Sequence, residues 1–407
     1  MLTRLLEAQN SRRIRRMKGL KFFAFAVLAG LAVSAASSAR AEERINEVRI
    51  VEVEAGYKDN IYLKTSDNIF RLDIYGYGQF RYTYQTNDIT GAEDLSNFQI
   101  QRTRLGFKGY VGSDKLKYQL LLSASQSGEF DKVSLLDWFV DYAPSKECGI
   151  RAGQFKVPYS TSFTISASEL QFVERTQVDS NFRLDRDNGV NLYGKVLDSM
   201  LTYNIGAYNG EGRNKSNPDN GMLYAARLMF EPFGKYAYHE SDNEISDKLL
   251  MLISAAYAVS TDQAGSSNTN LNARLATTAL GISEVTGSNA FVGAKYRGAS
   301  VHGEYFNRVI NPQTNGLSDE TAEGYYVQGG YFVMPKTVEV AARYEYFEPN
   351  KDKTEDLRKE YGIGVNYFIN GHRNKIQGDF FKIKDEAGKT KQGEEDSRLR
   401  VQYQLAF

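Results

Sequence analysis

The chain has 407 residues, with 50 Lys and Arg against 50 Asp and Glu, and its mean hydropathy of -0.47 is too polar for a bundle of membrane-spanning helices. Tyr (27), Phe (23) and Gly (35) are abundant while Pro (7) is scarce, which favours strands and turns over helices. This composition does not exclude a membrane β-barrel, because only alternate residues of its strands face lipid.

The first predicted element is an export signal. Residues 17–21 (MKGLK) form a basic n-region, residues 22–33 form an apolar h-region, and residues 39–41 (ARA) match a cleavage pattern, so we expect cleavage before Glu42. The signal is complete from Met17, which is an alternative start of translation. The apolar run is too short for a stop-transfer helix, and no other segment has the length and apolarity of a membrane-spanning helix.

Removal of this signal changes the charge. Residues 1–41 carry eight of the 50 basic residues and one of the 50 acidic residues, which leaves 42 basic and 49 acidic residues and a net charge of about -7. The surplus of acid argues against nucleic-acid binding through a basic surface. Cys148 is the only cysteine, so no intramolecular disulfide can form, and we expect a buried thiol in a turn.

Residues 42–69 are a short acidic lead-in that we assign to the periplasm, where a small plug, a hairpin and a short helix are all compatible with the sequence. Residues 70–407 alternate with the period of two that is typical of strands. In the first stretch, one mainly apolar face opposes a polar one: Leu72, Ile74, Phe80, Tyr82 and Tyr84 against Arg71, Asp73, Tyr75, Gln79 and Arg81.

Similar stretches recur to the end of the chain and predict an all-β fold, a transmembrane antiparallel β-barrel of about 16 strands. A soluble β-sandwich or β-helix also alternates, but it would not place Tyr and Phe at so many outward strand ends. The expected spans are 71–85, 97–111, 115–126, 132–143, 147–156, 188–196, 200–209, 221–232, 247–260, 289–298, 300–309, 321–334, 336–347, 357–369, 373–384 and 396–407.

The connections between these spans alternate between short and long, as periplasmic turns and outer loops do in such barrels. The longest in the first half, residues 157–187, follows the fifth span and is therefore the third external loop. A loop this long within a compact domain is usually functional. We expect it to fold into the lumen and narrow an aqueous channel, although an outward-facing surface loop is the alternative.

The chain ends in Phe407, and a terminal aromatic resembles the C-terminal signature of bacterial outer-membrane proteins that the barrel assembly machinery reads. Five segments together resemble the phosphate-selective porin O and P family. They are RTRLGFKG at 102–109, LDWFVDYAP at 136–144, RAGQFKVPY at 151–159, ELQFVER at 169–175 and RDNGV at 186–190. The dense similarity covers residues 95–210, and beyond it the likeness rests on the strand pattern and Phe407.

The resemblance implies a homotrimeric porin in the outer membrane of a Gram-negative-type bacterium, in contact with outer-membrane lipid. It implies passive diffusion of small inorganic anions such as phosphate, or of other small hydrophilic solutes. We expect no metal site, because the sequence has no Cys or His cluster, and no cofactor. It also implies that Arg and Lys line the pore and bind anions. The candidates are Arg102, Arg104, Lys108, Arg151, Lys156, Arg175 and Arg186, with Arg81 a weaker addition from the polar face of the first span.

Strand parity constrains these candidates. A charge facing lipid near the midplane costs roughly 2–4 kcal/mol, so Arg102, Arg104 and Lys108 should face the lumen. Arg151 and Lys156 have opposite parity and share a face only if a bulge intervenes. Arg175 and Arg186, in the constricting loop, are the strongest candidates for the constriction.

Acidic residues lie beside these cations, at Asp137, Asp141, Glu169, Glu174, Asp185 and Asp187. Opposed charges at a constriction give a weakly selective pore, so a general porin is the main alternative. An outer-membrane enzyme is a weaker one, because the three histidines lack a nucleophile elbow or a Cys/His cluster. A structural or adhesion barrel with a closed lumen is the third.

Overall fold

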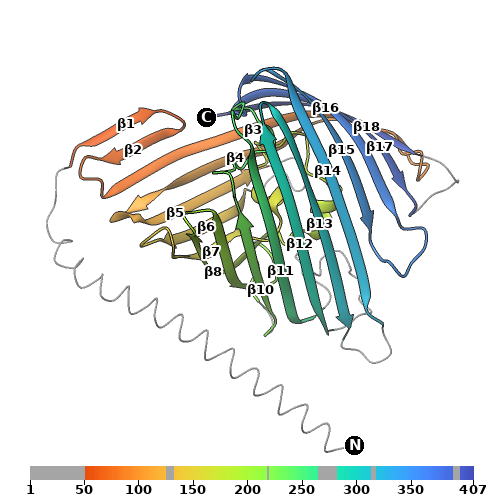
Figure 1. Ribbon diagram of the computed structural model, residues 1–407, viewed down its shortest axis with the longest axis horizontal. Helices are drawn as coiled ribbons and strands as arrows, with labels where there is room; N and C mark the ends of the chain where they lie inside the picture. Colours follow the sequence, from red (N-terminus) through yellow and green to blue (C-terminus); the bar gives the residue numbers. More distant parts are fainter. Residues whose placement is uncertain (1–50, 125–132, 218–219, 265–281, 313–317, 388–394) are drawn as a thin grey trace, which may run out of the picture. The chain divides into compact units, whose positions relative to one another are not determined.

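The computed structural model describes residues 51–124, 133–217, 220–264, 282–312, 318–387 and 395–407. The predicted signal peptide lies outside these residues. Residues 53–407 form one compact unit, which is an antiparallel β-barrel (Figure 1).

Sixteen strands of the described chain form the barrel, each paired with its neighbours in sequence. They are β3 (Phe70–Gln85), β4 (Leu95–Val111), β5 (Ser113–Ala124), β6 (Ser134–Tyr142), β7 (Gly149–Lys156), β8 (Arg186–Val196), β9 (Leu201–Tyr208), β10 (Met222–Phe230), β11 (Leu250–Ala264), β12 (Ile282–Tyr296), β13 (Ala299–Pro312), β14 (Glu320–Met334), β15 (Val338–Glu348), β16 (Arg358–Asn370), β17 (Asn374–Asp385) and β18 (Asp396–Ala406).

Pairing of β18 with β3 closes the barrel, from Arg398 opposite Gln85 to Ala406 opposite Tyr77. The backbone of Phe407 continues this seam, because its N–H and C=O both pair with Gly76 at 3.0 and 3.1 Å. Within the lead-in, β1 (Val53–Tyr57) and β2 (Ile61–Thr65) form a hairpin, and β2 pairs with the start of β3. The described part of the lead-in is therefore a hairpin rather than a plug or a helix.

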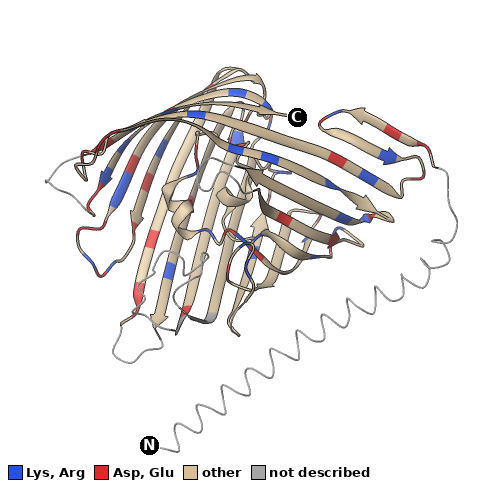
Figure 2. Cartoon of the chain, turned by 180° about the vertical axis from the view of Figure 1, so that it is seen from behind, with Lys and Arg blue, Asp and Glu red and all other residues tan. Residues whose placement is uncertain are grey.

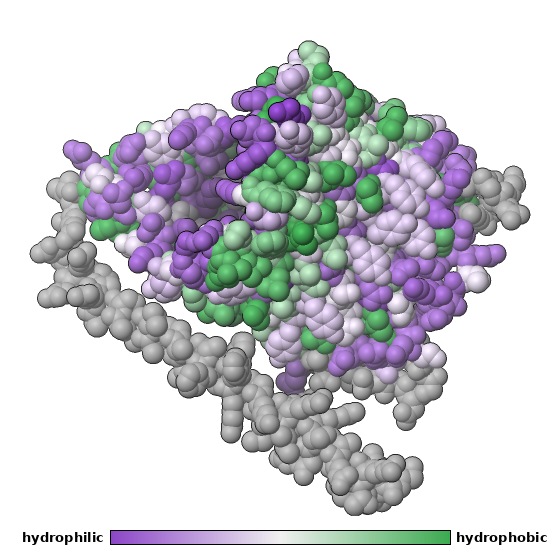
Figure 3. All heavy atoms as spheres, viewed as in Figure 1, coloured by the Kyte–Doolittle hydropathy of each residue, from purple (hydrophilic) through white to green (hydrophobic). Residues whose placement is uncertain are grey.

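Apolar side chains face outward from the barrel, and polar side chains face its lumen. Large apolar residues such as Trp138 (54% exposed) and Ile363 (64% exposed) face outward, whereas Arg343, Asn366 and Gln377 are buried on the lumen side. Figure 3 shows hydrophobic residues gathered over the outer wall, beside a hollow bordered by hydrophilic ones. Lipid-facing and lumen-facing residues alternate because a strand turns successive side chains to opposite faces.

Each of the sixteen predicted spans overlaps one barrel strand, and two details differ. β12 begins at Ile282 rather than residue 289, because residues 282–288 pair with β11 and β13 despite their turn-like Thr, Gly and Ser content. In β4 the register shifts between Ile100 and Arg102, so that Gln101 is an extra residue. This bulge turns Phe98 and Ile100 outward while it leaves Arg102 and Arg104 facing the lumen.

The connections alternate in length, with a short-turn end and a long-loop end. Gly112 (φ +74°) forms the tight turn between β4 and β5, a conformation that L-residues rarely adopt. Cys148 lies exposed in the turn between β6 and β7, so the expectation of a buried thiol is wrong, because this turn leaves the barrel wall.

The third long loop, residues 157–185, folds into the lumen. It contains α2 (Thr161–Thr164) and α3 (Gln177–Phe182), and we name it loop L3.

Candidate functional site

Loop L3 is docked on one wall of the barrel by carboxylates of that wall. Glu304 of β13 accepts hydrogen bonds from the backbone N–H groups of Thr161 (2.6 Å) and Ser162 (3.1 Å) at the start of α2. Glu345 of β15 accepts from the N–H of Gln177 (2.6 Å) at the start of α3. The first N–H groups of a helix have no partner within the helix, so these carboxylates fix both helical turns of L3 in the lumen.

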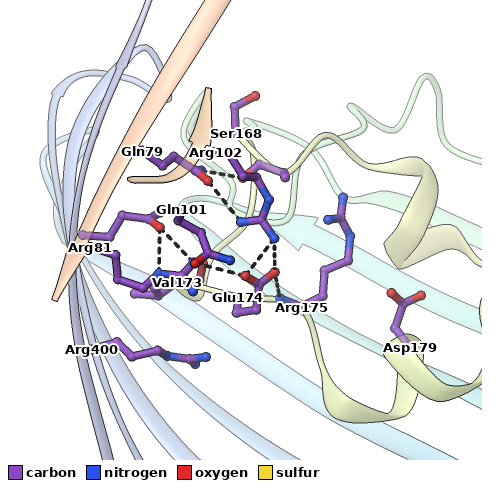
Figure 4. Close-up of polar contacts among 12 residues, drawn as sticks. Gln79, Arg81, Gln101, Arg102, Ser168, Val173, Glu174, Arg175, Asp179 and Arg400 are labelled. Atoms are coloured by element: carbon purple, nitrogen blue, oxygen red, sulfur yellow. Dashed lines mark hydrogen bonds and ion pairs between the residues drawn. The ribbon is translucent and has the colours of Figure 1, made fainter. Parts of the chain in front are cut away.

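The middle of L3 reaches across to the seam of the barrel. Glu174 accepts two hydrogen bonds from the Arg102 guanidinium, at 2.6 and 2.7 Å, and one from Arg81 at 3.1 Å (Figure 4). Burial alone would raise the pKa of the Glu174 carboxyl, but the adjacent Arg102 and Arg81 hold it well below its ordinary value. Arg81 also donates to the carbonyl of Val173, so both candidate cations of this seam hold the loop.

Two further candidates stabilise the loop, Arg175 from within it and Lys156 from the end of β7. The Arg175 guanidinium is buried and donates to the carbonyls of Ser162 and Ile165. The Lys156 ammonium donates to the carbonyls of Phe163, Thr164 and Ile165, at 2.6, 3.2 and 3.1 Å. These carbonyls end α2, where a cation is favourable. Arg175 therefore shapes L3 through its carbonyl contacts.

A second segment enters the lumen from the short-turn end. The β10–β11 connection, residues 231–249, lies against the inner wall, and Glu240 accepts from the N–H of Gln171 (2.8 Å) in L3. Its own N–H donates to the carbonyl of Glu169 at 3.2 Å, and Ser241 donates to Glu339 of β15 at 2.8 Å. The sequence pattern leaves residues 233–246 as a connection between two expected strands and does not predict this fold. The aromatic pair at Tyr236 and Tyr238, unusual in a solvated turn, was the available signal.

The wall formed by β4 and β5 carries cations that these two segments leave unpaired. Arg104, Lys108 and Lys117 share the lumen face with Gln119, and none forms a salt bridge with a described residue. The Arg104 Nε is buried and has no hydrogen-bond partner within the described ranges, while its guanidinium lies 5.5 Å from the Tyr77 ring centroid. Lys108 is exposed to the lumen, 4.8 Å from the Tyr75 ring centroid.

The carboxylates beside this wall are already engaged. Asp137 of β6 accepts from Arg186 at 2.8 Å, and Asp141 accepts from Arg151 at 2.6 Å. The Arg151 guanidinium also lies 4.2 Å from the Phe139 ring centroid. The nearby acids therefore neutralise Arg151 and Arg186, while Arg104 and Lys108 form no salt bridge with any residue that the structure describes. Figure 2 shows the charged residues of the strands from behind.

The structure thus sorts the eight candidates. Arg104 has Arg186, Arg102 and Arg175 among its charged neighbours. Arg175 belongs to L3, whereas Arg186, which was expected in the loop, is the first residue of β8. Arg151 and Lys156 both reach the lumen without a register shift in the β7–β8 pairing, because Lys156 is the last residue of β7 and its ammonium meets L3 directly. Lys108 lies farther along β4 toward the short-turn end.

Two of the three histidines lie together at the short-turn end of the barrel. The His239 and His372 rings lie 5.6 Å apart at the short-turn end; burial and Lys295 lower the pKa of His239 to about 4, and burial, Lys375 and His239 lower that of His372. No histidine ring in the described ranges bonds to a Ser, Thr or Cys side chain, and no group of three His, Cys, Asp or Glu residues there could hold a metal ion. None of the described helices has the length and apolarity to cross a bilayer.

Comparison with known proteins gives one family and many related folds. The family model described as "Phosphate-selective porin O and P" matches residues 74–407. A search of curated protein sequences finds no match.

The solved structures that are similar share the fold at low sequence identity. An anion-selective porin from Comamonas acidovorans aligns with a TM-score of 0.59 and 13% identity, covering 83% of this chain and all 100% of its own. Outer-membrane expressed OmpT of Vibrio cholerae gives 0.55 and 12%, covering 87% and 100% of the two chains. OprB of Pseudomonas putida gives 0.55 and 10%, covering 83% and 94%.

Proposed function

The chain belongs to the phosphate-selective porin O and P family and is therefore an outer-membrane porin of a Gram-negative bacterium, and we propose that its channel favours small anions, phosphate among them. The observation that carries the proposal is Arg104. Its guanidinium faces the lumen beside L3 without a carboxylate partner among the described residues, and its charged neighbours are other arginines.

The separation of charge across the lumen supports this selectivity. Carboxylates of the β13–β17 wall, such as Glu304 and Glu345, are occupied by the N–H groups of L3. On the β4–β5 wall, Arg102 pairs with Glu174, whereas Arg104, Lys108 and Lys117 form no salt bridge with a described residue. A solute that passes between L3 and the β4–β5 wall therefore meets positive potential, and rings or rows of Arg and Lys select anions in this way.

The net negative charge of the mature chain does not oppose this. Many acidic side chains form hydrogen bonds or ion pairs inside the barrel wall, as Asp379 does with Arg400 at 2.8 Å. The paired charges Arg186–Asp137 and Arg151–Asp141 favour the second candidate, a general porin with weak selectivity. Catalysis is no part of the proposed function.

The proposal includes the expected assembly. We infer a homotrimer in contact with outer-membrane lipid, inserted by the barrel assembly machinery through a signal that ends in Phe407. The support is the family, the outward apolar face, and the position of Phe407 at the seam with Gly76.

Substitution of Arg104 tests the selectivity. Arg104→Gln removes one uncompensated positive charge at L3, so the anion-to-cation permeability ratio should fall by about twofold or more. Arg297→Gln is the matched control, because Arg297 is exposed at the short-turn end beside Tyr296, outside the lumen. The readout is the reversal potential of purified protein in a planar bilayer under a KCl gradient. An anion-to-cation permeability ratio that is the same in Arg104→Gln and in the wild type would show that Arg104 does not contribute to selectivity.

A further inference from the structure

Three lysines project outward from the barrel at its long-loop end. β16 begins at this end and β17 finishes there, and the two strands run side by side (Figure 1). Lys359 of β16 shares the outward parity of the exposed Tyr361 and Ile363. Lys382 and Lys384 of β17 are exposed and alternate with buried residues. Because successive side chains of a strand point to opposite faces, these three lysines point away from the lumen.

The arginines at the same wall point the other way. Arg358 and Arg398 both donate to Glu360 on the lumen side, each at 2.7 Å. Arg400 is buried and donates to Asp379 at 2.8 Å. The arginines are therefore neutralised within the barrel, and the three outward lysines take no part in these ion pairs.

The outward lysines lie close to one another. Lys359 and Lys384 are cross-strand partners, and Lys382 stands opposite Tyr361 in the next pair on the same face. Side chains directly opposite each other in an antiparallel pair have Cβ atoms about 5 Å apart, and like charges there repel. Lys384 pairs with Glu395 at 2.8 Å. Lys359 and Lys382 form no salt bridge with a described residue, so the cluster keeps a surplus of positive charge.

The acidic side chains of the neighbouring strands are engaged elsewhere. Glu323 of β14 accepts from Lys351 at 3.0 Å, and Glu348 of β15 accepts from the hydroxyl of Tyr346 at 2.8 Å. The Lys359 ammonium lies 5.9 Å from the centroid of the Tyr346 ring. Its neighbour on β15 is therefore a ring and not a carboxylate.

A belt of tyrosines lies at the level of the lysines on the outer face. The rings of Tyr344 and Tyr361 lie 5.1 Å apart, and those of Tyr325 and Tyr346 lie 5.2 Å apart, so the belt crosses β14, β15 and β16. Aromatic belts of membrane barrels mark the interface between lipid headgroups and hydrocarbon. The long-loop end is the outer one, so the lysines lie at the headgroup level of the outer leaflet.

The outer face becomes apolar beyond the tyrosine belt, toward the short-turn end. Ile363, Val365 and Phe380 are exposed there on β16 and β17. A free phosphate ion would use only the cationic level of this surface. A phosphorylated lipid complements all of it, because its phosphate matches the lysines and its acyl chains match the apolar residues.

We propose that Lys359, Lys382 and Lys384 bind the phosphorylated headgroup of an outer-leaflet lipid, whose acyl chains lie on Ile363 and Val365. The negative charge of the headgroup offsets the repulsion between Lys359 and Lys384. The inference rests on the outer-membrane barrel and not on the selectivity of its channel.

Native mass spectrometry of the purified protein with lipid A, a diphosphorylated glycolipid, tests this site. The wild type should retain lipid A. Lys359→Gln/Lys382→Gln should bind it about tenfold or more weakly, because each lysine near an anionic headgroup contributes about fivefold. Lys146→Gln/Lys336→Gln is the matched control, since both lysines are exposed in turns at the short-turn end. The control removes the same charge and should bind lipid A like the wild type.

Two further probes separate the parts of the ligand. Dephosphorylated lipid A should bind the wild type about tenfold or more weakly than lipid A. Inorganic phosphate at millimolar concentration should not displace lipid A, because it has no acyl chains. Lys359→Arg/Lys382→Arg keeps the charge and should bind like the wild type. An unchanged single-channel conductance in KCl shows that each variant is folded, since these side chains face away from the lumen.

Equal affinity of Lys359→Gln/Lys382→Gln and its control for lipid A would overturn the inference. Displacement of lipid A by inorganic phosphate would also overturn it and would identify a site for a free anion. A wild type that retains no lipid A would contradict it as well and would leave this face to a second copy of the chain. A wild-type channel without anion preference would refute the proposed function and leave this inference standing.

Discussion

Glu174 links loop L3 to the seam of the barrel through Arg81 and Arg102, and its acid–base behaviour decides how firmly the loop is held. Its pKa in the folded protein is below the ordinary value, so the ion pairs stabilise the folded state above the ordinary pKa of a glutamate. The stabilisation is lost only as the pH falls through the lowered value.

We predict that the L3 anchor survives at pH 4 to 5 and that Glu174→Gln weakens it at any pH at which Glu174 of the wild type is charged. The variant leaves the Arg102 and Arg81 guanidinium groups without a carboxylate, and removal of one partner from a buried pair is strongly destabilising. The measurement is open-channel current noise, which rises when the loop moves. If the wild type at pH 5 were as noisy as Glu174→Gln at pH 7, the carboxyl of Glu174 would not have the lowered pKa that Arg102 and Arg81 give it.

Sequence parity predicted the lumen face of Arg102, Arg104 and Lys108, because a strand leaves only two choices. It could not predict their partners. Arg102 is paired with Glu174 across 72 positions of sequence, whereas Arg104, two residues away, has no carboxylate partner in the described part of the chain. The fold of L3 decides this difference, and strand periodicity carries no information about it.

At the scale of elements, the two inward segments act together. L3 fills the lumen beside β13–β18, and the β10–β11 connection supports it from the short-turn end through Glu240 and Gln171. The spans of the strands could be predicted because alternation continues for about ten residues in each. The inward path of residues 231–249 could not, since it depends on long-range contacts such as Ser241 with Glu339.

Glu304 provides the most direct test of the L3 dock. Glu304→Ala leaves the buried N–H groups of Thr161 and Ser162 without an acceptor, at about 1–3 kcal/mol for each group. L3 should then leave the wall, and single-channel conductance should rise while selectivity falls. Glu304→Gln keeps an acceptor oxygen and should restore most of the wild-type behaviour. Identical conductance in Glu304→Ala and the wild type would show that the carboxylate does not hold the loop.

At the scale of the whole molecule, the lumen face of the barrel carries many ion pairs, and its free charge differs between two opposite walls. The wall that docks L3 uses its carboxylates for hydrogen bonds to the loop, and the β4–β5 wall presents Arg104, Lys108 and Lys117 to the lumen. Composition alone suggested the opposite sign, because the mature chain has more acids than bases. Overall net charge and the charge along a pore are different quantities, and only the second acts on a permeating ion.

The reversal potential of the purified wild-type protein in a planar bilayer measures the anion selectivity of the channel. Under a KCl gradient at pH 7, we expect a potential displaced toward the equilibrium potential of chloride, with chloride current reduced when inorganic phosphate is added. A potential at zero, or one displaced toward that of potassium, would contradict anion selectivity and leave a general porin.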